Sequence, residues 1–588
     1  MKLLSALAGL CAPVFAVSSA HTLWSQRAYG AGGASIKWTD SVVLSTGRVV
    51  ACATEYGAKS TLLLQAWEPD GTVAWVYRFP DAGDQYYEKA AVLATDGSNV
   101  FAVGTRSASP TSDDDEVFAL KLNSFGLLLQ TEQFGANPYG YDEVVCGAAI
   151  TAFGELFVTG YSKPAIVTTH EGWVAKLDNT FRYDELTPLN YETRVTPGKP
   201  FPLPDGRVLV PSEGDLVGGF SYRTRLSRIN SLGVEDAAYQ VANTTGTVQP
   251  VARTSAGQIF FLVQDGGGFR VSKLTPDLAL LGTTVVNDHF YNRGSILWSD
   301  AAQALYVCSD RYTEDLLDMR KYTVNGQLVW SDTPANVTNH LGDYMLKADR
   351  FGNPVVVSNE IRDNGNVNFV AWCWDSRGLR QWKNAFTNTE TSDDIPSSFT
   401  LDDKLRLIAV GRAENPADPH NDYKGAIWRT SQFFHRTPDN LTMRLGYAVA
   451  GSLADLAEPD GVSQTLGNDS MVFGLTSAIV ADYETNFPIE IVDPATTSLE
   501  VRLDMSCNAS SGYVALMMYD WTVNTWRFVW DGTLSNLPNT QVANISSPQR
   551  YVRPGSRQVR TRIITAPLRR PLVPFRVFVD SVEVRSDT

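Results

Sequence analysis

The stretch GELFVTG, from Gly154 to Gly160, places a turn residue before a short run of apolar side chains. This pattern occurs eight times along the chain, and the starts are 46 to 56 residues apart. The copies are GRVVACA from Gly47, SNVFAVG from Ser98, GELFVTG from Gly154, GRVLVPS from Gly206, GQIFFLV from Gly257, QALYVCS from Gln303, GNPVVVS from Gly352 and LRLIAVG from Leu405. Short strands at such a period are typical of a β-propeller, in which each repeat forms one four-stranded blade.

A second pattern follows each copy of the first and consists of an apolar run that ends in a reverse turn. Clear examples are LQAWEPDG ending at Gly71, LKLNSFG ending at Gly126 and KYTVNG ending at Gly326. Asn, Asp, Pro and Gly favour tight reversals of the backbone, so these turns predict β-hairpins. The two patterns together therefore predict the second and third strands of each blade.

The fourth strand of a blade should follow this turn, as TVAWVYRF follows Gly71 and LRQWKNAF follows Gly378. No such strand follows the last repeat, but a similar segment, WSQRAYG, precedes the first repeat within residues 21–33. Pairing the N-terminal strand with the last blade would leave no open sheet edge. We therefore predict eight blades, with WSQRAYG paired to the strand ending near Trp428–Thr430. Seven blades are the alternative if the irregular fourth or eighth repeat is not a blade.

The two ends of the chain differ from the repeats. Residues 1–20 have a lysine at position 2, an apolar stretch and small residues up to Ala20, which predicts a secretory signal peptide. Residues 437–588 contain no lysine, and short runs such as LEVRLDM and FRVFVDSVEV predict a jelly-roll-like β-sandwich. The predicted organisation is a signal peptide at 1–20, a β-propeller at 21–436 and a β-sandwich at 437–588.

Composition limits the partners. A net charge of -15 argues against a nucleic-acid partner, which requires a basic surface. No stretch after the leader is long and apolar enough for a membrane span. The five cysteines beyond residue 20 form no CxxC pair, and they fit small buried side chains, although a disulfide stays possible on the sequence alone.

One basic segment occurs in the C-terminal region. Between Asp531 and Asp580 there are eight arginines and no acidic residue. One interpretation is a patch for an anionic polymer such as an acidic glycan; the other is a solvated sheet face whose arginines pair with acidic residues on neighbouring strands, which the pattern favours. The candidate patch consists of Arg557, Arg560, Arg562, Arg569 and Arg570.

Local catalytic motifs are absent: the sequence contains no HExxH, no GxSxG and no GxxxxGK. We expect no cofactor, although the acidic run from Asp113 to Glu116 offers oxygens to calcium. The turns ending in Trp75, Trp330 and Trp382 resemble the blade-docking turns of quinone-dependent alcohol dehydrogenases. The cysteine pair and the haem motif of that family are missing, so a dehydrogenase is a minor alternative.

The repeats also resemble a known family. GELFVTG with EGWVAKLDNT, and SNVFAVG with EVFALKLNSFG, are similar to the bacterial SBBP-type β-propeller repeat of exported and surface proteins. The resemblance covers residues 81–180 well and the other repeats loosely. It implies an extracellular ring-shaped module and supplies no catalytic residues.

These observations lead to two functional predictions. The first is a secreted or cell-surface, non-catalytic binding or scaffold protein, whose propeller is an interaction platform and whose sandwich attaches to a glycan, an envelope component or a protein. The alternative is an extracellular polysaccharide-active hydrolase or lyase with carboxylates in the propeller funnel, since a pair from different strands leaves no local motif. Acidic, histidine or tyrosine side chains that meet in the propeller funnel and have shifted pKa values would favour the enzyme over the binding protein.

Overall fold

The computed structural model describes only part of the chain: residues 22–28, 34–79, 87–109, 115–135, 142–163, 169–189, 192, 194–215, 222–244, 250–265, 268–287, 294–311, 316–334, 337–338, 345–349, 352–361, 367–375, 378, 380–385, 394–401, 407–414, 423–430, 433–436, 438–456, 463–468, 478–486, 499–545, 547–568 and 574–587. The predicted signal peptide, Asp113 and Asp114 of the acidic run, and Arg569 and Arg570 lie outside these residues. The chain divides into two compact units, Ser19–Thr430 and a unit that contains Ser431–Thr588.

The described residues form an all-β structure. Its only helical segments in these ranges are two short 3-10 turns, Leu453–Leu456 and Pro548–Arg550. No helix in the described part of the chain has the length and apolar character needed to cross a membrane.

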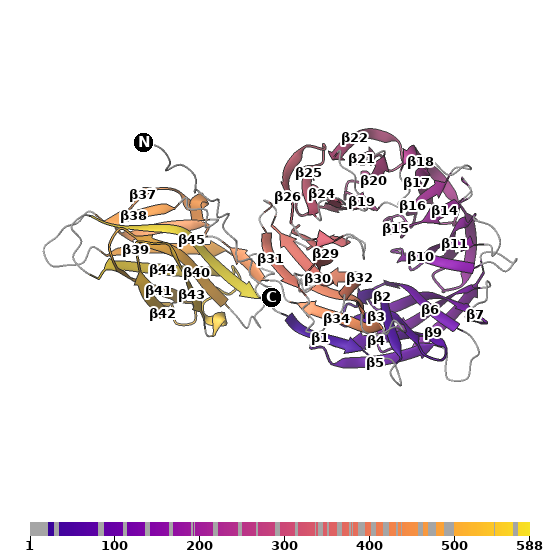
Figure 1. The fold of residues 1–588 in the computed structure, drawn as a ribbon, viewed down its shortest axis with the longest axis horizontal. Coiled ribbons are helices and arrows are strands. Elements are labelled where there is room, and N and C mark those ends of the chain that lie inside the picture. The colour runs from indigo at the N-terminus through magenta and orange to yellow at the C-terminus, as the bar shows by residue number, and fades with distance from the viewer. Residues whose placement is uncertain are drawn as a thin grey trace, which may run out of the picture. The chain divides into compact units, whose positions relative to one another are not determined.

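The first unit is propeller-like: antiparallel sheets follow one another around a ring (Figure 1). The first three sheets are β2 (Ser35–Val43), β3 (Val49–Tyr56), β4 (Ser60–Trp67) and β5 (Val73–Phe79); β6 (Tyr87–Thr95), β7 (Asn99–Ser107), β8 (Glu116–Asn123) and β9 (Leu128–Phe134); and β10 (Asp142–Ile150), β11 (Leu156–Lys163), β12 (Glu171–Leu177) and β13 (Tyr183–Pro188).

A nine-stranded sheet follows: β14 (Arg194–Pro197), β15 (Phe201–Pro202), β16 (Val208–Asp215), β17 (Tyr222–Ile229), β18 (Glu235–Thr244), β19 (Val251–Arg253), β20 (Ile259–Asp265), β21 (Gly268–Leu274) and β22 (Leu280–Asn287). Its two halves are joined where β18 pairs with β20 through Thr244 and Asp265. The next sheets are β23 (Gly294–Ser299), β24 (Ala304–Arg311), β25 (Leu316–Thr323) and β26 (Leu328–Asp332), and then β27 (Val337–Thr338), β28 (Met345–Ala348), β29 (Pro354–Ile361), β30 (Val367–Trp374) and β31 (Arg380–Ala385).

The last sheet of this unit combines segments from distant parts of the chain. It contains β32 (Asp394–Leu401), β33 (Leu407–Glu414), β34 (Tyr423–Thr430) and β1 (Thr22–Ala28). β1 is antiparallel to β34, with Ser25 opposite Trp428. The predicted pairing of WSQRAYG with the strand ending near Trp428–Thr430 is therefore confirmed.

Tight turns connect the first to the second strand, and the third to the fourth, because one turn residue adopts a left-handed backbone. Gly126, for example, has φ 79° and its N–H donates to the carbonyl of Asn123 at 3.0 Å. Glycine tolerates this conformation without a steric penalty. In LDNTF the same place is taken by Phe181, with φ 63°, which explains why this repeat keeps its turn although it lacks the glycine.

The core lies between neighbouring sheets. Val50 and Cys52 of the first sheet, for example, are buried together with Val100 and Ala102 of the second. Because the second strand of each sheet is covered on both faces, its sequence is a continuous apolar run instead of an alternating one. Cys52, Cys308, Cys373 and Cys507 are buried thiols, and Cys146 is a partly buried thiol; none of these five forms a disulfide.

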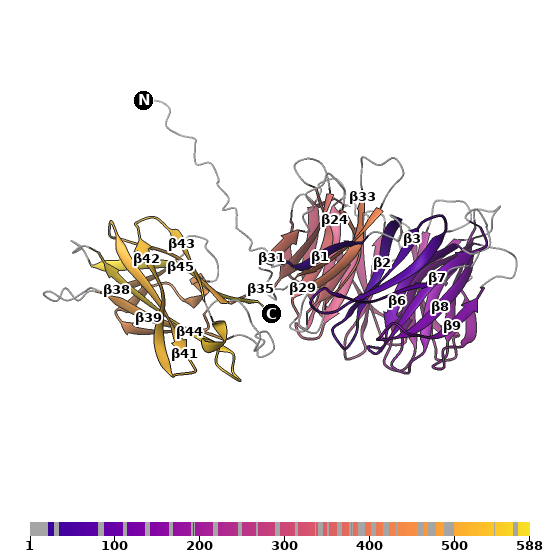
Figure 2. The ribbon, with the colours of Figure 1, turned by 90° about the horizontal axis from the view of Figure 1, so that it is seen from below.

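The second unit consists of two antiparallel sheets (Figure 2). One contains β35 (Phe433–Arg436), β37 (Tyr447–Ala450), β38 (Gln464–Asn468), β40 (Leu499–Cys507), β43 (Asn539–Asn544) and β45 (Phe575–Asp587); the other contains β36 (Asn440–Leu445), β39 (Ile479–Asn486), β41 (Gly512–Asp520), β42 (Thr525–Leu534) and β44 (Gln558–Pro567). Alternate residues of β44 are buried, with Val559 and Ile563 inside and Arg560 and Arg562 on the other face, as the sequence predicts.

Candidate functional site

Acidic side chains collect at one edge of the sheets in the first unit. This edge, which we call the acidic edge, is the one where the first and third strands begin and the second strand ends; the tight turns lie at the opposite edge. Its buried or partly buried acidic residues include Glu55, Glu88, Asp115, Glu143, Glu213, Asp215, Asp318 and Asp394. They come from several repeats, so no single local motif contains them all.

Several of these carboxylates have partners that neutralise or satisfy them. Glu55 Oε2 lies 2.7 Å from Arg78 Nε, and Asp318 Oδ2 lies 2.7 Å from Arg320 Nη2. Glu143 accepts hydrogen bonds from Ser162 Oγ at 2.9 Å and from Trp173 Nε1 at 2.8 Å. A buried charge that is paired and hydrogen-bonded is stable in place, so these groups have a structural role.

The end of β16 brings several polar side chains of the acidic edge together. Glu213 lies on β16 between Thr196 of β14 and Thr224 of β17, each directly opposite it in the two antiparallel pairs. Glu213 Oε2, Asp215 Oδ1 and Thr224 Oγ1 are buried and have no hydrogen-bond partner among the described residues. Buried polar atoms are almost always satisfied in native proteins. Three such atoms on one face of one sheet therefore mark a place where a ligand or water should bind.

Glu213 also has an unusual proton affinity. Burial raises the pKa of its carboxyl group to about 7, because desolvation disfavours the charged form. Asp215 lies two residues further on the same strand face, and its Oδ2 lies 3.6 Å from Arg194 Nη1. We call these two acidic groups the Glu213–Asp215 pair.

A histidine completes this cluster. His170 Nε2 lies 2.9 Å from Thr196 Oγ1, and the carbonyl of His170 accepts a hydrogen bond from the Val195 N–H. The centroid of its ring lies 4.5 Å from that of Tyr161. Burial, and then the positive charges of Arg194 and Lys163, lower the pKa of His170, so its imidazole is neutral at pH 7.

The sequence contains a weak signal for this cluster. The apolar run GRVLVPS is followed by EGD, with two acidic residues, whereas the three residues after each other copy include at most one acidic residue. The sequence analysis did not single out Glu213, Asp215 or His170: the two acidic residues are neighbours on β16, but the burial of Glu213 and the approach of His170 depend on the surrounding strands.

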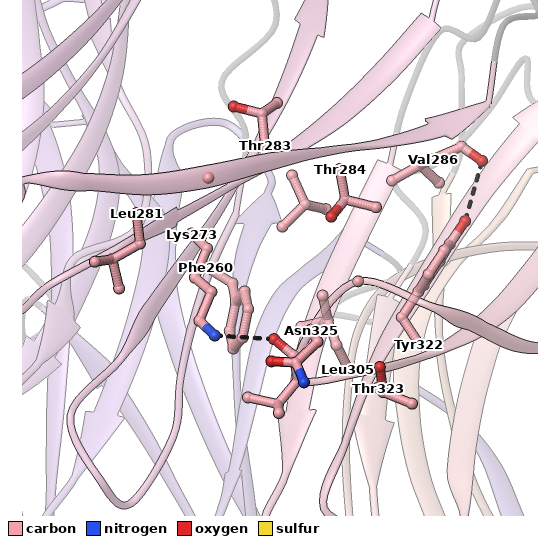
Figure 3. Close-up of a pocket in the computed structure, with 14 residues that line it drawn as sticks. Phe260, Lys273, Leu281, Thr283, Thr284, Val286, Leu305, Tyr322, Thr323 and Asn325 are labelled. Carbon is pink, nitrogen blue, oxygen red and sulfur yellow. Dashed lines mark hydrogen bonds between the residues drawn. The ribbon is translucent and has the colours of Figure 1, made fainter.

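A separate cavity of about 260 Å³ lies between β21–β22 and β24–β25 (Figure 3). Its walls include Phe260, Val286 and Leu305, and Lys273 and Asn325 are among its polar residues. No acidic residue lines it, so it offers no carboxylate for acid–base chemistry.

The predicted arginine patch is partly described. Arg562 Nε lies 2.5 Å from Asp482 Oδ1, and Arg560 Nε lies 3.0 Å from Glu484 Oε1, across β44 and β39. The Arg562 guanidinium also lies over the ring of Trp526, 4.0 Å from its centroid. Arg557 precedes β44 in a left-handed conformation. Arg560 and Arg562 thus share one face and are ion-paired there.

The acidic run considered for calcium is described only at its end. Asp115 Oδ2 lies 3.1 Å from Lys89 Nζ. Among the residues that the structure describes, no cluster of three or more His, Cys, Asp or Glu side chains is arranged to hold a metal ion.

No protein-family model matches the chain, and no curated protein matches it. Solved structures with a similar fold include a puromycin hydrolase mutant, with 12% identity, a TM-score of 0.36, and coverage of 68% of this chain and 62% of that one. Prolyl oligopeptidase B from Galerina marginata has 7% identity and a TM-score of 0.38, with coverage of 67% and 56%. The β-propeller domain of the Trilobed protease from Pyrococcus furiosus has 8% identity and a TM-score of 0.35, with coverage of 60% and 98%.

This comparison corrects one prediction from the sequence. The prediction of a non-catalytic binding or scaffold protein is wrong, because the similar solved structures are mostly peptidases and hydrolases. That prediction depended on missing local motifs, and catalytic groups from different strands leave none. The likeness concerns the fold, so the activity is argued below from the side chains of this chain.

Proposed function

We propose that the protein is a polysaccharide hydrolase in which Glu213 is the general acid and Asp215 is the general base. The observation that carries this proposal is the set of three buried, unpartnered polar atoms on Glu213, Asp215 and Thr224. A carboxyl group with a pKa of about 7 holds its proton near neutral pH and can give it to a leaving group.

The Glu213–Asp215 pair supports glycosidic chemistry. The proton of Glu213 would pass to the glycosidic oxygen as the bond from that oxygen to the sugar carbon breaks. A water molecule would attack the same carbon from the opposite face and lose its proton to Asp215. Residues two apart on a strand have Cα atoms roughly 7 Å apart, which is compatible with the roughly 6.5 to 9.5 Å that separates carboxyl groups in inverting enzymes. We therefore propose inversion at the sugar carbon.

Neighbouring polar groups support binding of a hydroxyl-rich substrate. Thr196, Thr224 and the neutral His170 surround the Glu213–Asp215 pair and combine hydrogen-bond donors with acceptors. Arg194 would orient Asp215 through its guanidinium. The proposed chemistry uses only side chains of this chain.

The test is hydrolysis of soluble polysaccharides by the full-length protein, measured as new reducing ends, with the wild type, Glu213→Gln, Asp215→Asn and Asp205→Asn. Asp205 is the matched control, because it is exposed and paired with Arg207 at the opposite edge of the same sheet. We expect both site variants to lose roughly 100-fold or more of the rate and the control to keep it. Full activity in Glu213→Gln, or no hydrolysis of any substrate by the folded wild type, would overturn the proposal.

A second candidate is an acyl-transfer hydrolase that acts on peptides or esters through Thr196. The hydrogen bond of 2.9 Å between Thr196 Oγ1 and His170 Nε2 is the contact that a hydroxyl nucleophile and its base require. Under this alternative a fluorophosphonate probe should label the wild type and not Thr196→Val. Polysaccharide hydrolysis that survives in Thr196→Val would exclude Thr196 as the nucleophile of that reaction.

We also propose the finer architecture. The single pairing of Thr244 with Asp265 supports dividing the nine-stranded sheet into two blades, which makes eight blades, and the pairing of β1 with β34 supports closure by the N-terminal strand. The second unit would be a jelly-roll-like sandwich of its two sheets. The apolar leader and the SBBP-like repeats support export from a bacterium.

A further inference from the structure

The outer strands β5, β9, β13, β18, β22, β26 and β31 hold their third residue in the same register. Each of these residues lies opposite the residue that precedes the last paired one of the third strand, and a register shift separates those two pairs. The residue is a tryptophan in three strands (Trp75, Trp330 and Trp382), Gln130, Glu185 or Ala237 in three others, and Gly282 in β22. The opposite pairs include Trp75 with Ala66, Trp330 with Lys321 and Gly282 with Lys273. Gly282 thus occupies a position that carries an indole in three other outer strands.

The indoles at this position fill the junction with the next sheet. A Cβ atom added to Gly126, in the turn between β8 and β9, would lie 2.5 Å from the ring of Trp75. Trp75 Nε1 donates a hydrogen bond to the carbonyl of Ser124 in the same turn at 3.1 Å. Trp330 likewise covers Gly378, where an added Cβ would lie 2.7 Å from its ring.

Beside Gly282 there is open space, although the turn residue Gly326 is covered at this junction by the side chain of Thr284. A Cβ atom built on Gly282 meets no other atom within 4 Å, and the cavity of about 260 Å³ adjoins it. Lys273 Nζ donates a hydrogen bond to the carbonyl of Val324 at 3.1 Å (Figure 3). Val324 is the second residue of the turn between β25 and β26, and Ser124 holds the same place in the turn between β8 and β9 that Trp75 covers. The lysine thus makes the hydrogen bond that the indole makes elsewhere, but it does not fill the space.

The walls of the cavity suit a flat apolar group. Phe260, Val271, Val286 and Leu305 line it and are buried. An apolar cavity of roughly 150 Å³ accommodates benzene, so one of about 260 Å³ has room for two fused rings. Besides its bond to Val324, the Lys273 ammonium has further N–H groups to donate, and these would suit an acceptor on the ligand.

We propose that this cavity, the Gly282 pocket, binds a planar aromatic small molecule of about the size of indole that carries an acidic substituent. The ring occupies the cavity beside Gly282, and the carboxylate accepts a hydrogen bond from Lys273. The pocket belongs to a different junction from the Glu213–Asp215 pair, so this inference does not depend on the proposed hydrolase activity.

The test is calorimetric titration of the full-length protein with indole-3-acetate and with indole. We expect saturable binding of both, with indole-3-acetate the tighter. Gly282→Trp should weaken both by roughly ten-fold or more and raise the unfolding temperature, because its own indole fills the pocket. Lys273→Met should weaken indole-3-acetate and leave indole unchanged.

Two further variants keep the result interpretable. Leu129→Trp places an indole at an exposed position of another outer strand, β9, and should bind both probes like the wild type. Gly282→Leu fills part of the pocket with a smaller side chain if Gly282→Trp does not fold. No saturable binding by the wild type, or unchanged binding of both probes in the folded Gly282 variant, would overturn the proposal.

Discussion

Ser25 of β1 lies directly opposite Trp428 of β34, so a strand from the start of the described chain is the outer strand of the last sheet of the first unit. Without β1, the outer backbone N–H and C=O groups of β34 would face solvent. An unpaired edge of this kind is a template for pairing with other chains.

Removal of residues 1–28 should therefore lower the unfolding temperature and promote aggregation, whereas removal of residues 1–21 should do neither, because it leaves β1 intact. Differential scanning calorimetry and light scattering of the two truncated proteins check this expectation. Equal unfolding temperatures for both would show that β1 contributes little to the ring.

The raised pKa of Glu213 makes stability depend on pH. The folded protein holds this proton up to a pKa of about 7, whereas the model value for an unperturbed glutamate is 4.5. The contribution of Glu213 to stability is therefore fully present below pH 4.5 and is lost as the pH rises toward 7. By linkage the loss is roughly 2 to 3 kcal/mol. Urea unfolding of the wild type and Glu213→Gln at pH 4.5 and 7.5 should show the variant gaining relative stability at the higher pH.

The same proton should control the rate of hydrolysis. If Glu213 is the general acid, the rate falls as the pH rises through about 7, because the carboxyl group loses the proton it must donate. Initial rates between pH 5 and 9 on a polysaccharide substrate check this. A rate that increases steadily up to pH 9 would contradict the assignment of Glu213 as the acid.

The indole of Trp75 should contribute measurably to the junction between the first and second sheets. Trp75→Ala removes its packing over Gly126 and its hydrogen bond to Ser124, and we expect a loss of about 3 kcal/mol in the free energy of unfolding. Gln130→Ala, at the corresponding place in β9, is the control and should lose less, because its exposed amide makes a hydrogen bond without filling a core. Urea unfolding of both variants provides the comparison.

Repeated local patterns explain what the sequence predicts well. The run from Gly154 to Gly160 contains both the turn residue and the apolar strand, so its conformation follows from neighbours in the chain. The pairing of β1 with β34 was also predictable, because a missing strand at one end matched a surplus strand at the other. The turn at Phe181 was less predictable from its residue type, because its left-handed backbone is imposed by the hairpin.

The candidate site is less predictable because its properties come from contacts between strands. Glu213 is an ordinary glutamate in the sequence, and its raised pKa depends on burial. Thr196 and Thr224 reach it only through the pairing of three strands. The Gly282 pocket has a clearer signal in the sequence, because LGTTVV has glycine at the position where TVAWVYRF and QLVWSD have tryptophan. That comparison requires knowing the register of the outer strands.

The pairing of β1 with β34 also determines when the last sheet can form during synthesis. β1 is made first, but its partner β34 emerges only after all the other strands of the first unit. The last sheet therefore cannot be completed until nearly three quarters of the protein exists, and contacts this far apart in the sequence form slowly. During that interval β1 is an unpaired strand, so a chaperone or export factor that holds the nascent N-terminus would directly affect the yield of folded protein.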